Sequence, residues 1–179
     1  ATLAGHSGMV LSVAFHPREQ VLATGSSDQT AKVWRMSADC TAATCVATLA
    51  GHSGAVWSVA FHPTGRFVAT GSLDNTVKLW RMSADCTAAT CVATLAGHSN
   101  IVRSVAFHPT GRFVATGSQD NTAKVWRMST DYTAATCVAT LAGHSGPVYS
   151  VAFHPREQVL ATSSLDNTVK LWRMSADCT

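Results

Sequence analysis

The sequence has 179 residues, of which 46% are hydrophobic and 13% are charged, and its formal net charge is +3. The apolar share is typical of a globular protein, whereas a charge this small and this evenly spread argues against a nucleic-acid-binding groove. No apolar run approaches the ~20 residues that span a bilayer, and the first residues lack a basic stretch followed by a signal-peptide core. We therefore expect a cytoplasmic protein, or a soluble recombinant one, with neither a nucleic acid nor a membrane as a partner.

Four copies of one segment make up the chain. Gly-His pairs begin at Gly5, Gly51, Gly97 and Gly143, and the repeated tryptophans are Trp34, Trp80, Trp126 and Trp172, so each step is 46 residues (51 − 5). We place the repeats at about 5–50, 51–96, 97–142 and 143–179. A fixed period of this size indicates a solenoid, a propeller or an array.

Each period contains four short strand patterns. They are CVATLA at 45–50, AVWSVAF at 55–61, RFVATG at 66–71 and TVKLWRM at 76–82, separated by GHSG, HPTG, SLDN and a longer SADCTAAT connection. The separating segments have turn-forming compositions, and nothing between them has the pattern of an amphipathic helix. Four strands per repeat, with Gly-His at the start and a tryptophan near the end, predict an all-β fold built from the blades of a β-propeller.

The repeats resemble the WD40-repeat family over the whole chain. In that family a buried tetrad joins the histidine of Gly-His, a Ser or Thr on the second strand, the Asp of the next turn and the Trp of the third strand. The matching positions here are His6, Thr24, Asp28 and Trp34; His52, Thr70, Asp74 and Trp80; His98, Thr116, Asp120 and Trp126; and His144, Thr162, Asp166 and Trp172. The name-giving Trp-Asp is uniformly Trp-Arg here, at Arg35, Arg81, Arg127 and Arg173, which are outside the tetrad.

The resemblance also implies an offset between repeat and blade, because the outer strand of each blade precedes the next Gly-His. Residues 1–4 begin part-way through such a strand, and the chain stops at Thr179 before the matching strand of its last repeat. A closed ring of four blades needs a rotation of about 90° from each blade to the next, whereas a ring of eight blades needs about 45°. We therefore predict a head-to-tail homodimer that forms one eight-bladed ring, a half-ring (1–179) per chain, with residues 1–4 completing a fourth blade of the other chain. The alternative is an incomplete fragment that aggregates through its open sheet edge.

Two patterns raise the question of catalysis or metal binding. Each repeat offers His, Thr and Asp, the residue types of a nucleophile, a base and an orienting group, but four copies tied to a tryptophan favour an internal hydrogen-bonded chain. The histidines of the His-Pro turns, His16, His62, His108 and His154, come one per repeat, whereas zinc needs its ligands around one ion. We read them as turn residues kept extended by the following proline, and we expect no cofactor, no metal and no catalytic residues.

The six cysteines could bridge a connection, Cys40 to Cys45 and Cys86 to Cys91. Tyr132 occupies the position that would pair with Cys137, and Cys178 ends the chain before its own mate. Because this framework leaves two cysteines over, we favour reduced thiols over disulfides.

The positions at which the near-identical repeats differ are the ones that could carry a specific function. They are the third residue after the tetrad histidine (Met9, Ala55, Ile101, Pro147), the fifth (Leu11, Trp57, Arg103, Tyr149) and the residue before the tetrad Asp (Ser27, Leu73, Gln119, Leu165). In the family these positions face the surface on which partners bind, here called the top face. Trp, Tyr and Arg are enriched at binding hot spots.

These observations predict a non-enzymatic interaction scaffold that binds an unknown protein or peptide through the top face. The alternative explanation is that residues at structurally tolerant positions differ between repeats without any effect on function. The close similarity of the repeats also leaves open a self-assembling architectural or engineered repeat protein with no specific ligand. A hydrolase or a metal enzyme is a third, weaker possibility.

Overall fold

The computed structural model describes residues 1–175, and these residues form fifteen β-strands. Among them, no helix is long and apolar enough to cross a bilayer. The strands form four antiparallel sheets, which we call blades 1 to 4 in chain order, and each sheet follows the order of the sequence. The predicted all-β architecture of propeller blades is confirmed.

The strand bounds repeat from blade to blade. Blade 1 consists of β1 (Val10–Phe15), β2 (Val21–Ser26), β3 (Thr30–Met36) and β4 (Ala43–Ala50). Blade 2 consists of β5 (Val56–Phe61), β6 (Phe67–Ser72), β7 (Thr76–Met82) and β8 (Ala89–Ala96). Blade 3 consists of β9 (Val102–Phe107), β10 (Phe113–Ser118), β11 (Thr122–Met128) and β12 (Ala135–Ala142). Blade 4 has β13 (Val148–Phe153), β14 (Val159–Ser164) and β15 (Val169–Arg173).

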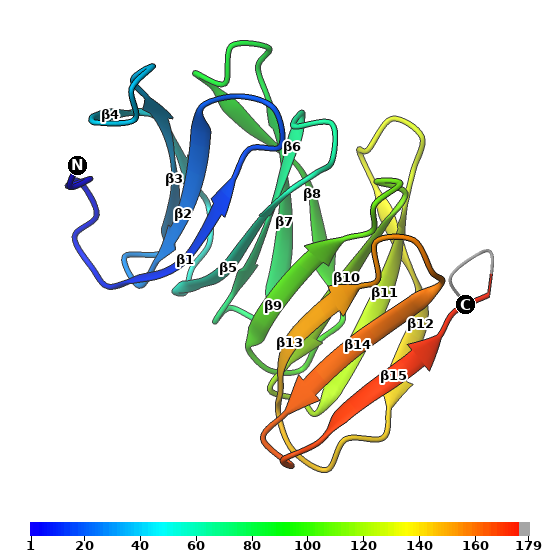
Figure 1. Ribbon diagram of the computed structural model, residues 1–179. Coiled ribbons are helices and arrows are strands. Elements are labelled where there is room, and N and C mark those ends of the chain that lie inside the picture. The colour runs from blue at the N-terminus through cyan, green and yellow to red at the C-terminus, as the bar shows by residue number, and fades with distance from the viewer. Residues whose placement is uncertain (176–179) are drawn as a thin grey trace.

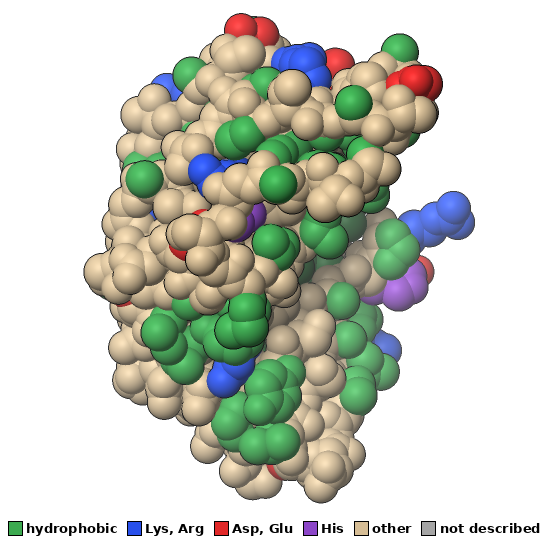
Figure 2. Space-filling view, turned by 90° about the vertical axis from the view of Figure 1, so that its left-hand side faces the viewer, with side chains coloured by type: hydrophobic (Ala, Val, Ile, Leu, Met, Phe, Trp, Pro, Cys, Tyr) green, Lys and Arg blue, Asp and Glu red, His purple; other side chains and the backbone are tan. Residues whose placement is uncertain are grey.

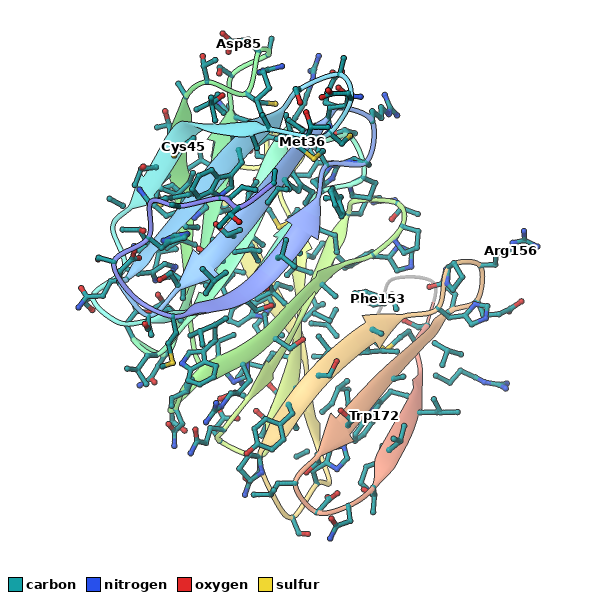
Figure 3. The ribbon with its side chains drawn as sticks, turned by 60° about the vertical axis from the view of Figure 1, so that its left-hand side comes forward. Met36, Cys45, Asp85, Phe153, Arg156 and Trp172 are labelled. Atoms are coloured by element: carbon teal, nitrogen blue, oxygen red, sulfur yellow. The ribbon has the colours of Figure 1, made fainter. Side chains whose placement is uncertain are left out.

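The four blades lie side by side in an arc, with blade 1 at one end and blade 4 at the other (Figure 1). The inner strands β1, β5, β9 and β13 are consecutive neighbours, so each blade contacts the next through its inner edge and faces. Figure 3 shows Trp172 and Phe153 on the sheet of blade 4, and Arg156 on the turn that projects from it. Residues 1–4 adopt no strand, and the described part of blade 4 ends with β15.

The hydrophobic core lies between blades rather than inside them. One cluster joins Leu79 of blade 2 to Val102 and Val105 on the inner strand of blade 3. Equivalent clusters fill the junctions between blades 1 and 2 and between blades 3 and 4. Blades 2 and 3 therefore carry buried apolar side chains on both faces, and each face is covered by a neighbouring blade.

A β-bulge occurs at the start of each inner strand. Val56 pairs with Ser72 and Ser58 with Gly71, so Trp57 is the extra residue between them. The same register shift makes Leu11, Arg103 and Tyr149 the extra residues of β1, β9 and β13. Bulges re-aim a side chain out of the regular alternation of the strand.

Candidate functional site

Each blade is closed by a hydrogen-bonded chain of four side chains, illustrated by blade 2. Trp80 Nε1 donates to Thr70 Oγ1 at 2.8 Å, Thr70 Oγ1 lies 2.7 Å from His52 Nε2, and His52 Nδ1 lies 2.7 Å from Asp74 Oδ2. Asp74 also accepts hydrogen bonds from the backbone and hydroxyl of Thr76. These hydrogen bonds link the segment before β5 to the β6–β7 turn and to β7, which fixes that segment against the sheet.

The protons of this chain can be assigned from its geometry. The indole can only donate, so Thr70 accepts from Trp80 and gives its own proton to His52 Nε2, while Nδ1–H of His52 donates to Asp74. Burial lowers the pKa of His52, although the hydrogen bond and charge of Asp74 oppose this effect. Burial raises the pKa of Asp74, but the hydrogen bonds from Thr76 and His52 outweigh it and bring the value to about 2. The resting state is thus a neutral imidazole beside a carboxylate.

The other three tetrads have the same geometry. Across all four blades the His–Asp, His–Thr and Trp–Thr distances fall between 2.7 and 2.9 Å. The threonine hydroxyl, which would be the nucleophile of a Ser-His-Asp-like set, is enclosed: Thr70 and Thr116 are fully buried. A nucleophile needs access to its substrate, so this arrangement suits a structural role in blade closure.

The positions that vary between repeats come together at one end of the blades. The backbone nitrogen of Leu73 donates to the carbonyl of Ala55 at 2.9 Å, which joins two of the three variable positions of blade 2. The equivalent pairs in the other blades are Ser27 with Met9, Gln119 with Ile101, and Leu165 with Pro147. The third variable position in each blade is the extra residue of the bulge. The loop pair and the bulge residue of each blade thus belong to one end of its sheet.

Arg103, the bulge residue of blade 3, contacts the bulge residues of the two neighbouring blades. The Arg103 guanidinium carbon lies 4.2 Å from the centre of the Trp57 ring and 5.3 Å from the centre of the Tyr149 ring. Arg103 Nη2 donates to Gln119 Oε1 at 2.9 Å. We call Trp57, Arg103, Gln119 and Tyr149 the arginine cluster. The structure does not bring the blade 1 positions into it: Met9 is 72% exposed at the open end of the arc.

The histidines of the His-Pro turns have a role that the sequence did not indicate. The His62 ring packs edge-on against Phe107 of the next blade, with ring centres 5.1 Å apart, and its Nε2 lies 3.2 Å from the Gly111 carbonyl. His16 contacts Phe61, and His108 contacts Phe153, in the same way. These side chains therefore stabilise the junctions between blades. Each of these three histidines precedes the phenylalanine that it contacts by 45 residues (61 − 16).

A cavity of about 490 Å³ lies between loops of blades 2 and 3, at the end of the blades opposite the top face. Tyr132, which replaces a cysteine of the other repeats, stacks on Phe67 at 4.6 Å and meets the edge of His62.

The five cysteines within residues 1–175 are free thiols, and Cys178 falls outside the described residues. Residues 1–175 contain no group of three or more His, Cys, Asp or Glu side chains that could hold a metal ion.

Comparison with known proteins agrees with this geometry. The family model described as WD domain, G-beta repeat matches residues 1–35, 43–81, 89–127 and 135–173. WD repeat-containing protein 37 of Xenopus tropicalis is 58% identical over 31 residues, which cover 17% of this chain and 6% of that protein. The human protein of the same name is 59% identical over 32 residues, or 18% of this chain and 6% of that protein.

The chain thus aligns with only a small part of the length of these relatives. Propellers with these repeats are generally non-enzymatic and generally bind proteins or peptides. The four matches cover most of the chain, and each contains one His-Thr-Asp-Trp tetrad. The last three matches are offset from the blades, because each begins with the outer strand of one blade and ends with the third strand of the next. The protein belongs to the WD40-repeat family.

Proposed function

We propose that the protein is a non-enzymatic interaction scaffold that binds a protein or peptide partner through its top face. The observation that carries this proposal is the arginine cluster, in which Trp57, Arg103 and Tyr149 from three blades meet. Each of these residues is the extra residue of a bulge, so its side chain leaves the regular packing of the inner strand. Trp, Arg and Tyr are the residue types that contribute most to binding at protein interfaces.

The top face also carries exposed apolar side chains around the cluster. Leu73, Tyr149 and Leu165 are exposed by 45%, 43% and 58%. Exposed apolar side chains that gather near polar anchors are typical of interaction sites. The blade scaffold is nearly constant while these positions change, which supports a face whose chemistry varies independently of the fold.

Selection from a random peptide-display library tests the proposal. The selected peptides should lose at least about tenfold in affinity, about 1.4 kcal/mol, for the variant in which Trp57, Arg103 and Tyr149 are all serine. A control variant, Arg66→Ser with Arg112→Ser, changes exposed residues in turns between strands and should bind as the unmodified protein does. Selected peptides that bind the triple variant unchanged, or a library that yields no binder, would contradict a top-face function.

We also propose that two chains join head to tail into one eight-bladed ring. Within the chain, three junctions between blades repeat the same contacts. Ser12, Ser58 and Ser104 each accept a hydrogen bond from the backbone nitrogen 47 residues further on, at 3.1, 3.1 and 3.2 Å. A repeated contact implies a repeated rotation from blade to blade, and a repeated rotation generates a ring when a whole number of steps completes one turn.

The two ends of the arc carry the two halves of a fourth junction. Val56 and Leu79 are fully buried between blades, whereas the equivalent Val10 of blade 1 is 55% exposed and Leu171 of blade 4 is 73% exposed. Figure 2, which faces the side of the molecule where blade 1 lies, shows hydrophobic side chains gathered in patches on the surface. Leu171 of one chain packed against Val10 of a second copy would remove both from water.

The repeat predicts the contacts of that fourth junction. Continuing the spacing of the three internal junctions, Ser150 would accept a hydrogen bond from the backbone of Val13 of a second copy. His154 would pack edge-on against Phe15, which is 66% exposed in one chain. Residues 1–4 of the second copy would lie beside β15 and supply the outer strand of blade 4, which would cover an open sheet edge.

A purely architectural role without a ligand is the second candidate. The observation that favours it is the near identity of the repeats, since blades 2 and 3 differ at only eight positions. The display selection separates the two candidates, because an inert ring would assemble normally and select no peptides that depend on the arginine cluster.

A further inference from the structure

We infer that the top face recognises a carboxylate of an acidic peptide, held at Arg103. This inference rests on the proposed function, because it names the chemistry of the partner that the top face would bind. The evidence for it is the environment of the Arg103 side chain, which its neighbours hold in place and which has no acidic partner within residues 1–175.

Arg103 is fixed before any ligand arrives. Its guanidinium lies between the rings of Trp57 and Tyr149, 4.2 and 5.3 Å from their centres. Gln119 Oε1 accepts a hydrogen bond from its Nη2 at 2.9 Å. An arginine that is already ordered loses less conformational entropy on binding than a free surface arginine does.

The charge of Arg103 has no partner within residues 1–175. The ion pairs among these residues are the four His–Asp pairs of the tetrads, and none includes an arginine or a lysine. The side chain makes one hydrogen bond, to Gln119, although a guanidinium has five N–H donors. A positive charge flanked by two rings and left without an acid is complementary to an anion.

The remaining polar groups of the cluster are also donors. Arg103 Nε and Trp57 Nε1 are buried and make no hydrogen bond within the described residues. Because the Nε side of the guanidinium is enclosed, a ligand must approach from the Nη side. There, Gln119 uses its oxygen for Arg103, which leaves its amide nitrogen as a second donor. Two donors side by side match the two oxygens of a carboxylate.

Titration with a matched pair of peptides tests the inference. The probes are acetyl-(Glu-Gly)₃-amide and the same peptide with glutamine in place of glutamate, added to the ¹⁵N-labelled protein. The readouts are the affinity and the NMR signal of the Arg103 Nε–H group. We expect the glutamate peptide to bind about 10- to 100-fold more tightly, as for a charge-assisted hydrogen bond, and to shift that signal.

Variants assign the effect to Arg103. Arg103→Gln should bind both peptides equally, whereas Arg103→Lys keeps the charge but loses the planar fork and should retain only part of the preference. Arg112→Gln removes a positive charge from an exposed turn residue and should keep the full preference. Melting temperatures of all variants establish that each is folded.

Three results would overturn the inference: equal affinities for the two peptides, a preference that survives in Arg103→Gln, or no binding of the glutamate peptide at millimolar concentration. Failure of this inference can be distinguished from failure of the scaffold proposal. If display selection yields peptides without acidic residues that still require Trp57 and Tyr149, the top face binds partners but does not recognise a carboxylate.

Discussion

The hydroxyl oxygen of Ser58 accepts a hydrogen bond from the backbone nitrogen of Val105 at 3.1 Å, so a side chain of one inner strand is fastened to the main chain of the next. Beside it, Leu79 packs against Val102 in a fully buried core. A polar contact that has a defined direction, next to close apolar packing, leaves little freedom in the angle between two blades. The same junction occurs three times within the chain, which is the basis for expecting a fourth between two chains.

Leu171→Glu should prevent that fourth junction from forming. A glutamate there would have to be buried without a partner, which costs several kcal/mol, so the variant should have the mass of one chain in solution. Leu73→Glu is the matched control, because Leu73 is also exposed but belongs to blade 2, which has both neighbours. A Leu171→Glu protein with the same mass as the unmodified protein would place the interface elsewhere.

Thr70→Val should destabilise the protein by about 1–3 kcal/mol per chain, the usual cost of leaving buried polar groups unpaired. Valine has the shape of threonine but leaves Trp80 Nε1 without its acceptor and His52 Nε2 without its donor. Thr70→Ser keeps the hydroxyl and should cost less. Urea unfolding measures both variants, and an equal loss in the two would show that the methyl group, not the hydroxyl, matters at this position.

Stability should fall as the pH drops from 7 to 5. Burial lowers the pKa of His52, His62 and His98 in the folded state, whereas histidines of the unfolded chain keep a pKa of about 6.5. Below that value the unfolded chain binds more protons, so the free energy of unfolding decreases with decreasing pH. Urea unfolding at pH 7.5 and 5.5, at constant ionic strength, measures the change. A free energy of unfolding that rises toward pH 5.5 would contradict the assignment of neutral, buried histidines.

A second loss of stability should occur below about pH 4. The folded pKa of Asp74 is about 2, below the ordinary value of about 3.9. Its contribution is therefore complete above about pH 4 and is lost as the pH falls toward 2. Asp74→Asn removes this carboxylate, so the variant should be less stable at pH 7 but lose less on going from pH 4 to pH 2.5. An unchanged loss would show that the carboxylate is not held in its charged form.

Thiol titration tests the state of the cysteines. The protein, denatured without a reducing agent, should show six reactive thiols, the number of cysteines in the sequence. A sample reduced before denaturation is the control. Four thiols missing from the unreduced sample would indicate two disulfides within the long connections instead.

The sequence predicts the blades and the four tetrads because these features repeat with the blade. A spacing of 46 residues places the same four side-chain types in every copy, and the structure joins them by hydrogen bonds. The bulges are different, because an extra residue such as Arg103 depends on how two strands pair, and strand alternation in the sequence does not reveal the register. The arginine cluster therefore required the structure, as did the packing of His62 on the next blade, since both involve contacts between repeats.

The mass of the native protein in solution tests the assembly most directly, by native mass spectrometry or light scattering over a range of concentrations. One chain has a mass of 18.8 kDa, so a closed ring of two half-rings should have twice that mass, 37.6 kDa, and should not grow with concentration. A mass near that of one chain, near three times it, or a mass that rises steadily with concentration would contradict the two-chain ring.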